Sequence, residues 1–250
     1  MNSLRKTQTN NKNIPPRNRG ILFKEVNCVQ LDKRLSVLAD LVRKEKTFAD
    51  IGTDHAYLPV YLVEKGIINK AIAADLRKGP LDNAKETVVA HNLSDKIELR
   101  LSDGLDNFTE NEVQEIAVAG MGGLLISEFI NRTQWLKNAD IHLILQPMTH
   151  VEELRKTLFD NGFIIENEVV AKDGDKIYII LSAYYYGDST AYTDLDLIVG
   201  RLPYNKDCLS REYLNKIFDK YNKKFIALKN ANKEYSDLEK IVEELSIWQQ

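Results

Sequence analysis

Short apolar runs alternate with segments of helical periodicity along the first two thirds of the chain. The runs predict β-strands, because strands buried on both faces of a parallel sheet are apolar throughout. They lie at 47–52, 70–75, 96–101, 115–120 and 141–146. The segments between them predict helices over 57–66, 79–91, 122–132 and 149–161. This alternation predicts an α/β fold, with an open parallel sheet covered by helices on both faces.

The hydrophobic pattern changes after residue 161. Two β-rich runs, 162–170 and 176–185, are separated by a short Asp-Gly-Asp turn at 173–175. No helix fits in that interval, so we expect these two strands to pair as an antiparallel hairpin. The predicted sheet therefore consists of parallel strands followed by a C-terminal antiparallel hairpin.

Helical periodicity is also present on either side of this region. A helix is predicted over 31–44, and from residue 205 onward apolar residues recur at spacings of three and four. Two apolar stripes, separated by a polar turn at 229–233, predict an antiparallel coiled-coil hairpin. The stripes consist of Leu214, Phe218, Tyr221, Phe225 and Leu228, and of Leu238, Ile241, Leu245 and Trp248. Such stripes usually form core, which leaves the polar face of the hairpin for binding.

The composition of the chain restricts the cellular compartment and the kinds of binding partner that we expect. With 250 residues, 44% hydrophobic and 28% charged, the chain is typical of a globular protein. No apolar run approaches the roughly 18–20 residues of a membrane span. The N-terminus lacks the apolar core of a signal peptide, the two cysteines are far apart, and the four histidines form no metal-binding spacing. We therefore expect a cytoplasmic protein with no metal, no membrane segment and no obligate protein partner.

The formal net charge of −3 conceals a basic excess near both ends. Residues 1–20 hold five basic and no acidic residues, and residues 211–233 hold seven basic and two acidic ones. Such segments are typical of contact with a polyanion such as nucleic acid. They are equally typical of a solvated helix face and an irregular tail, so charge alone leaves both interpretations open.

Candidate chemistry gathers where the first four predicted strands end. Ligands of open parallel sheets bind outside the carboxyl ends of the strands, at the point where the strand order reverses. The first strand leads into Asp50, Gly52, Asp54 and His55. The later strands lead into Asp75, Asp103 with Gly104, and the glycine-rich run from Ala119 to Gly123.

These residue types predict a site for an adenosine. A carboxylate after the second strand accepts hydrogen bonds from ribose hydroxyls, and one after the third accepts from the adenine amine. A dinucleotide would need several glycines in the first turn to hold its pyrophosphate. That turn has one glycine, Gly52, and two carboxylates, Asp50 and Asp54, which repel phosphate. S-adenosylmethionine has no phosphate and carries an ammonium and a sulfonium, so the acidic turn favours it.

Each residue taken alone also has a structural explanation. Asp50 serves equally as a turn cap, and His55 as a packed core histidine. The glycines from Gly120 to Gly123 also permit close helix packing or an anion site. The argument therefore rests on the order of these residues along one edge of the sheet.

Four motifs of the sequence resemble those of a known family. "DIGTDHAYLP" at 50–59, "SDGL" at 102–105, "VAGMGG" at 118–123 and "LQPM" at 145–148 are similar to motifs of the bacterial tRNA (adenine-22-N1)-methyltransferases. The likeness extends over residues 31–250. It implies an S-adenosylmethionine-dependent methyltransferase domain of Rossmann-like fold over 31–186 and a helical coiled-coil domain that helps to hold tRNA over 187–250. The polar, basic composition of the N-terminus predicts a disordered tail over 1–30, which is extra to the family pattern.

The resemblance also implies roles for individual residues. Cofactor-binding positions would be Arg34, Asp50, Gly52, Asp54, His55, Tyr57, Asp75, Asp103, Gly104, Ala119, Gly120, Met121 and Gly122. Substrate-binding positions would be Gly123, Pro147 and Met148. The basic face of 211–233 separately predicts that Lys220, Lys223 and Lys224 contact tRNA phosphates. Gln146 is a catalytic candidate, with tRNA as the partner. Asp54 is the second catalytic candidate, because the turn holds two acids where the cofactor amine needs only one.

Three alternatives remain open from the sequence. The first is a methyltransferase that acts on another RNA, a protein or a small molecule. The second is a non-catalytic RNA-binding protein that retains the fold. The third is an NAD-dependent oxidoreductase. A fold shared by many activities leaves these choices to the chemistry of the site.

Overall fold

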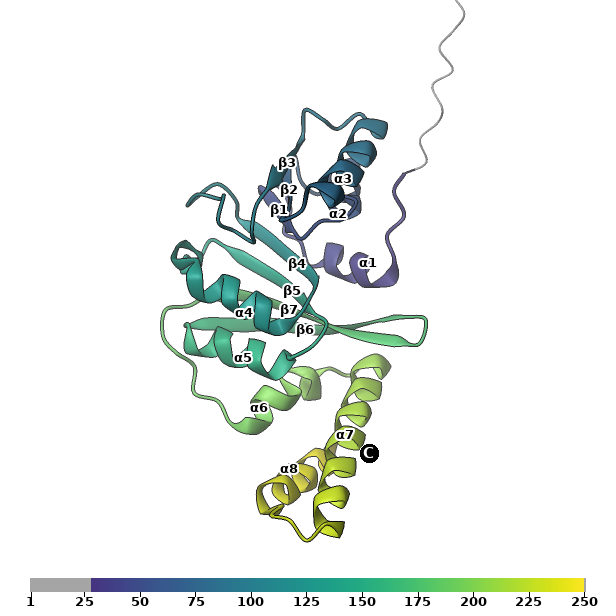
Figure 1. The fold of residues 1–250 in the computed structure, drawn as a ribbon, viewed down its shortest axis with the longest axis vertical. Coiled ribbons are helices and arrows are strands. Elements are labelled where there is room, and N and C mark those ends of the chain that lie inside the picture. Colours follow the sequence, from purple (N-terminus) through teal and green to yellow (C-terminus); the bar gives the residue numbers. More distant parts are fainter. Residues whose placement is uncertain (1–27, 250) are drawn as a thin grey trace, which may run out of the picture.

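The computed structural model describes residues 28–249, and it contains one seven-stranded sheet (Figure 1). Most of the tail predicted over 1–30 lies outside the described residues. The strands occur in the order β3-β2-β1-β4-β5-β7-β6 across the sheet. Their bounds are β1 Phe48–Ile51, β2 Ala71–Asp75, β3 Ile97–Leu101, β4 Glu115–Met121, β5 His142–Pro147, β6 Phe163–Asp173 and β7 Lys176–Tyr185.

Strand pairing confirms the predicted fold class. The first five strands pair in parallel, and β7 runs antiparallel to both β5 and β6. The second strand of the hairpin, β7, lies next to β5, so β6 forms the edge of the sheet. The order reverses at β1, which pairs with β2 on one side and β4 on the other. The predicted ligand position therefore lies beyond the ends of β1 and β4.

Helices cover both faces of the sheet, as the alternation of apolar runs predicts. One core cluster joins the sheet to α1 (Lys33–Asp40), α2 (Tyr57–Glu64) and α3 (Lys78–Ala90). The other joins it to α4 (Gly123–Arg132), α5 (Val151–Asp160) and α6 (Asp194–Val199). Neighbouring strand residues enter opposite clusters, since successive side chains point to opposite faces. Short 3₁₀ turns lie at Gln134–Leu136, Leu202–Tyr204 and Ile247–Gln249.

The C-terminal region is helical, as predicted. Helix α7 (Cys208–Asn230) extends away from the sheet, and α8 (Ser236–Ser246) folds back against it (Figure 1). The connection between them, residues 231–235, overlaps the polar turn predicted at 229–233. Leu214 and Leu245 enter the same core cluster as α4 and α5, while most other stripe residues stay partly exposed. The coiled-coil geometry itself stays a prediction.

A buried ion pair fastens the segment before α7 to the sheet. Arg155 of α5 donates from Nε to Glu168 of β6 over 2.7 Å, and both side chains are almost completely buried. Arg155 Nη1 also donates to the carbonyls of Leu197 and Ile198 at 2.6 and 3.0 Å. The second Glu168 oxygen accepts from the backbone N–H of Arg201 at 2.7 Å. The chain leading into α7 is thereby held to β6 by a fully satisfied polar network.

A second buried network joins the starts of β4 and β5. His142 lies 2.8 Å from Glu115 through Nδ1 and 2.6 Å from the Ser182 hydroxyl through Nε2. Arg43 also pairs with Glu115. The Ser–His–Glu order is that of a nucleophilic triad, but all three side chains are buried at the end of the sheet opposite the predicted site. The network therefore ties three strands together and has no access to a substrate.

Candidate functional site

A cleft opens beyond the ends of β1 and β4, where the order of the strands predicts a ligand. Its volume is about 360 Å³. Most of the predicted cofactor residues line it: Arg34, Asp50, Gly52, Asp54, His55, Tyr57, Ala119 and Gly120. Sequence reasoning missed the lining residues Asp32, Leu35, Thr53, Ala56 and Leu58.

Asp50 places a buried carboxyl group in the wall of this cleft. Burial raises its pKa from 3.8 to about 6, because the charged form loses solvation. A hydrogen bond from Thr53 and the charge of Arg34 lower this pKa, and the charge of Asp75 raises it. Ionising this carboxylate is therefore costly, and a cation bound beside it would stabilise the charged form.

The guanidinium of Arg34 is held at the same cleft by Gln146. Arg34 Nη1 donates to Gln146 Oε1 over 2.8 Å, and the Gly120 backbone N–H donates to the same oxygen over 3.1 Å. Gln146 is completely buried, and its amide group donates to the carbonyl of Pro147. This arrangement favours a positioning role for Gln146 over the catalytic role that the sequence predicts.

The turn between β1 and α2 forms the outer rim of the cleft. Asp54 is the exposed acid of this turn, with 70% of its side chain in solvent, and lies 3.4 Å from His55 Nε2. His55 stacks on Tyr57 with ring centroids 5.0 Å apart. The Thr53 hydroxyl accepts from the Ala56 N–H at 3.1 Å and fixes the turn. Asp50 and Asp54, equivalent in the sequence pattern, thus differ sharply in burial.

Glycine is required after the first strand by the backbone conformation and after the fourth strand by close packing. Gly52 has φ +81°, and a Cβ there would collide with the Met121 side chain. A Cβ on Gly123 would collide with the carbonyl of His150 and lie 2.7 Å from that of Thr149. The structure thus gives the predicted substrate residue Gly123 a packing role.

The ends of β2 and β3 lie beside the cleft without lining it. Asp75 is buried and accepts from the Arg77 N–H over 2.7 Å, and its carbonyl accepts from the Ser102 N–H over 3.0 Å. Asp103 pairs with Arg132 of α4, which reaches its carboxylate at 3.1 Å and its carbonyl at 2.6 Å. The structure brings the predicted ribose and adenine residues together. Met121 and Gly122 likewise lie near the cleft but outside its lining.

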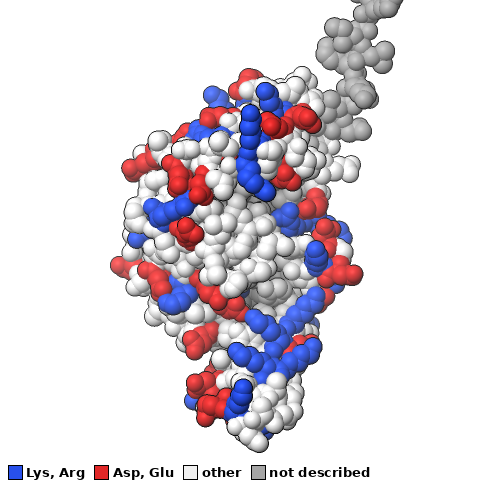
Figure 2. Space-filling view, viewed as in Figure 1, with Lys and Arg blue, Asp and Glu red and all other residues white. Residues whose placement is uncertain are grey.

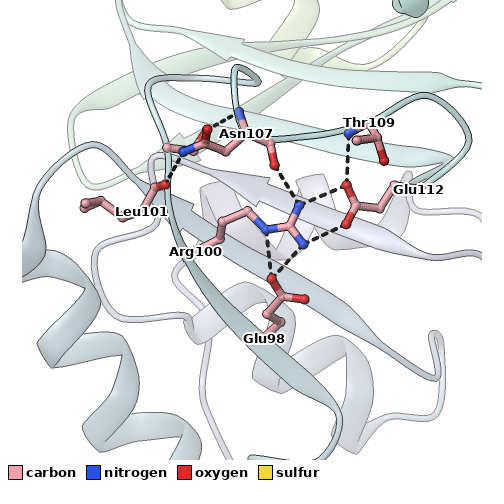
Figure 3. Close-up of polar contacts among 7 residues, drawn as sticks. Glu98, Arg100, Leu101, Asn107, Thr109 and Glu112 are labelled. Carbon is pink, nitrogen blue, oxygen red and sulfur yellow. Dashed lines mark hydrogen bonds and ion pairs between the residues drawn. The ribbon is translucent and has the colours of Figure 1, made fainter.

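Figure 3 shows a clamp centred on Arg100, which is linked to the Ser102–Asp103–Gly104 turn through Asn107. Arg100 makes a bidentate pair with Glu112, at 2.7 and 2.9 Å, and donates to Glu98 and to the Asn107 carbonyl. The backbone N–H of Asn107 donates to the Ser102 hydroxyl, which donates to the carbonyl of Gly104. No sequence motif indicated this clamp, because its members come together only when the loop after β3 folds.

Replacing Arg100 with methionine is expected to weaken cofactor binding about tenfold, the usual effect of losing about 1.4 kcal/mol of positioning hydrogen bonds. The turn would lose its bidentate anchor while the cleft wall at Asp50 stays intact. Isothermal calorimetry with S-adenosylmethionine measures the change. Lys156→Met, which removes an exposed ion pair on α5, is the matched control. Equal affinity of the Arg100→Met variant and the control would refute the positioning role.

The three predicted RNA-contacting lysines of α7 differ in their surroundings. Lys220 pairs with Glu152 at the start of α5 at 3.0 Å. Lys223 and Lys224 are exposed and make no ion pair within residues 28–249. Figure 2 shows lysine and arginine side chains gathered over α7. Lys220 therefore joins α7 to α5, while Lys223 and Lys224 remain available to a ligand.

The fold and the cleft define a class I methyltransferase. The reversed strand β7 inside the sheet and the acidic turn after β1 separate it from a dinucleotide-binding domain. A family model described as a methyltransferase domain matches residues 31–181.

Comparison with known proteins identifies the family. The Bacillus subtilis tRNA (adenine(22)-N(1))-methyltransferase is 34% identical over 177 residues, covering 71% of this chain and 74% of that protein. The crystal structure of the B. subtilis m1A22 tRNA methyltransferase TrmK is 28% identical, with a TM-score of 0.74 over 88% of this chain and 96% of that one. A Streptococcus pneumoniae protein in complex with S-adenosyl-L-methionine is 32% identical, with a TM-score of 0.77 over 88% of this chain and 100% of that one. The chain belongs to the tRNA (adenine-22-N1)-methyltransferase family.

Proposed function

We propose that this protein transfers a methyl group from S-adenosylmethionine to N1 of adenine 22 in tRNA. The observation that carries the proposal is the cleft beyond β1 and β4, where the buried Asp50 carboxyl and the Arg34 guanidinium face one ligand volume. Family membership supports the position of the methylated adenine. The helical C-terminal region and its basic face support an RNA substrate.

The cleft suits the charge distribution of S-adenosylmethionine. The cofactor supplies a methyl group on a sulfonium, together with an ammonium, a carboxylate and an adenosine. Asp50 matches the ammonium, and Arg34 matches the carboxylate. In this proposal Asp75 accepts hydrogen bonds from the ribose hydroxyls, and Asp103 accepts one from the adenine amine. A pyrophosphate has no comparable partner, because the turn after β1 presents carboxylates.

The exposed acid Asp54 acts on the target base in this scheme. N1 of adenine already has a lone pair, so no strong base is required, but the methylated ring carries a positive charge. A carboxylate near that ring stabilises the developing charge or accepts a proton from the amine. Because N1 normally faces a pairing partner, the adenine must be unpaired or extruded from its helix.

Asp54→Ala is expected to slow single-turnover methylation by about 10²-fold, the scale of a single acid–base or electrostatic contribution. Affinity for S-adenosylmethionine is expected to change little, because the Asp54 side chain is mostly in solvent. Rapid-quench methyl transfer and calorimetry measure the two quantities. Asp54→Asn, which keeps the shape and removes the charge, tests whether charge is responsible. An unchanged transfer rate would remove Asp54 from the mechanism.

The free lysines of α7 are proposed to contact tRNA phosphates. Reversing Lys223 and Lys224 to glutamate is expected to weaken tRNA binding and to flatten its dependence on salt, by a slope of about 0.9 for each lost phosphate contact. Lys220→Met, which removes a cation already paired with Glu152, is the comparison variant and is expected to change the slope less. Filter-binding titrations over a salt series measure this. An unaltered slope in the Lys223→Glu and Lys224→Glu double variant would contradict the contact.

Mapping the modified nucleoside tests the proposed function directly. Purified protein is incubated with S-adenosylmethionine and unmodified tRNA, and the product is located by nuclease digestion and mass spectrometry. We expect 1-methyladenosine at position 22. Methylation of another position, of protein or of a small molecule would assign a different substrate. Absence of transfer with intact tRNA binding would assign a non-catalytic RNA-binding role.

A location and a domain division follow from this proposal. A tRNA-modifying enzyme works in the cytoplasm, where its substrate is. No helix among the described residues is long and apolar enough to cross a bilayer. Residues 31–186 are proposed to form the methyltransferase domain and 187–250 the helical RNA-binding domain.

A further inference from the structure

Three large apolar side chains are exposed where the fourth and fifth strands end. Leu124 and Leu125 in the first turn of α4 are 54% and 41% exposed, and Met148 after β5 is 48% exposed. The core-facing side of α4 is already occupied by other residues, Ile126, Phe129 and Ile130, which are buried. The two leucines therefore contribute little to the core, and their exposure requires another explanation.

Backbone contacts hold the two segments that carry these side chains against each other. The Met148 N–H donates to the carbonyl of Met121 over 2.7 Å. The Gly123 N–H donates to the carbonyl of Thr149 over 2.8 Å. The start of α4 and the segment after β5 are thus fixed against each other, next to Gly120 in the cleft wall. We call Leu124, Leu125, Met148 and His150 the lip.

His150 contributes an exposed imidazole and a strained backbone to the lip. Its φ of 57° and ψ of 46° lie in the left-handed region, which disfavours residues other than glycine. The ring is exposed, and Nδ1 lies 3.0 Å from the Thr149 hydroxyl. Nε2 has no hydrogen-bond partner within residues 28–249. Strain of this kind persists at functional positions, where the side chain is needed.

The lip lies between the cleft and the basic helix. Two residues beyond His150, Glu152 binds Lys220 of α7, so the surface continues from the cleft across the lip to the free lysines. Figure 2 shows a largely uncharged surface above the cations of α7. A nucleic acid that reaches from α7 to the cleft would cross this uncharged region.

We propose that the lip binds the nucleobases that flank the target adenine in tRNA. This inference rests on the proposed function and adds to it a base-contacting surface. Phosphate contacts position a nucleic acid, while unpaired bases stack on apolar, aromatic and imidazole groups. Leucine, methionine and histidine offer such faces without charge, and the neighbouring α7 offers the cations. The alternative occupant of an exposed apolar surface is a second copy of this chain.

The double variant Leu124→Ser and Met148→Ser tests the lip. We expect tRNA affinity to fall about tenfold or more, the usual effect of losing one base-stacking contact. The salt slope and the affinity for S-adenosylmethionine should remain those of the unmodified protein, since no cation and no cleft residue is changed. Val89→Ser is the matched control, because Val89 of α3 is also 54% exposed but lies on the other face of the sheet.

Four results would overturn the proposal: unchanged tRNA affinity, a flattened salt slope, lost cofactor binding, or a wild-type dimer in sedimentation that the variant abolishes. The last result would assign the lip to a second copy. Wild-type protein that methylates no tRNA would instead refute the proposed function, so the two failures are distinguishable.

The variant His150→Gly tests whether the His150 side chain contributes to tRNA binding or to the stability of the fold. Glycine accepts the left-handed backbone, so we expect an unchanged or higher melting temperature together with weaker tRNA binding and slower methyl transfer. Full transfer activity in this variant would remove His150 from the lip. A lower melting temperature would show that the imidazole serves the fold.

Discussion

Arg155→Met is expected to lower the free energy of unfolding by about 3–5 kcal/mol, the cost of leaving one member of a buried ion pair uncompensated. Glu168 would keep its charge at a fully buried position and would retain only the backbone N–H of Arg201 as a donor. The carbonyls of Leu197 and Ile198 would lose their donors as well. Urea denaturation followed by circular dichroism measures the loss.

The control for this prediction removes both charges. Arg155→Met combined with Glu168→Leu should recover much of the stability, because a buried pair replaced by apolar residues of similar volume is often neutral. If the double variant were as unstable as Arg155→Met alone, the loss would come from the backbone carbonyls and not from the unpaired charge. A stability within about 0.5 kcal/mol of wild type for the single variant, the usual range for surface substitutions, would contradict the network.

Asp50→Asn is expected to stabilise the cofactor-free protein while abolishing tight cofactor binding. The pKa of Asp50 is raised from 3.8 to about 6, which corresponds to about 3 kcal/mol for ionising the buried carboxyl, at about 1.4 kcal/mol per pH unit. Asparagine removes that cost. It also removes the anion proposed to hold the ammonium, and about 10²-fold weaker binding would match the usual worth of a charged hydrogen bond. Thermal melts and calorimetry test the two effects.

The raised pKa of Asp50 determines how the stability difference between Asp50→Asn and wild type changes with pH. A raised pKa in the folded protein means that folded Asp50 retains its proton between pH 3.8 and about 6, while the unfolded chain loses it. The protonated Asp50 carboxyl makes its full contribution to the stability of the folded protein below pH 3.8, and this contribution is lost as the pH rises through about 6. The stability difference between Asp50→Asn and wild type should therefore be near zero at the acidic end and reach its maximum above pH 6. A difference that is constant across this window would contradict the raised pKa.

The sequence was sufficient to predict the elements and the edge of the sheet at which the cleft lies, for a physical reason. In β2, the residues from Ala71 to Ala74 are apolar because both faces of the strand are buried, and Asp75 stands out at the end of that run. Every parallel strand ends at the same edge, so order along the chain places Asp50, Asp75 and Ala119 near one another before any contact is known.

Contacts between distant side chains could not be predicted in this way. Arg34 and Gln146 are 112 positions apart, and nothing local in "LQPM" indicates that the amide faces Arg34 and Gly120. The same holds for the Arg100 clamp. Asp50 and Asp54 look alike in the sequence, and only the fold buries one and exposes the other. Register and burial depend on tertiary packing, which periodicity does not encode.

The fastening of the 197–201 segment to β6 has a consequence for the proposed choice of substrate. If α7 holds the tRNA backbone, its separation from the cleft is fixed by Arg155 and Glu168 and does not adapt to the RNA. The protein would then select its nucleotide by the distance between that nucleotide and the bound RNA backbone, more than by base sequence. A tRNA with one nucleotide inserted between the bound backbone and adenine 22 would present the neighbouring residue to the cleft, and methylation would shift or cease.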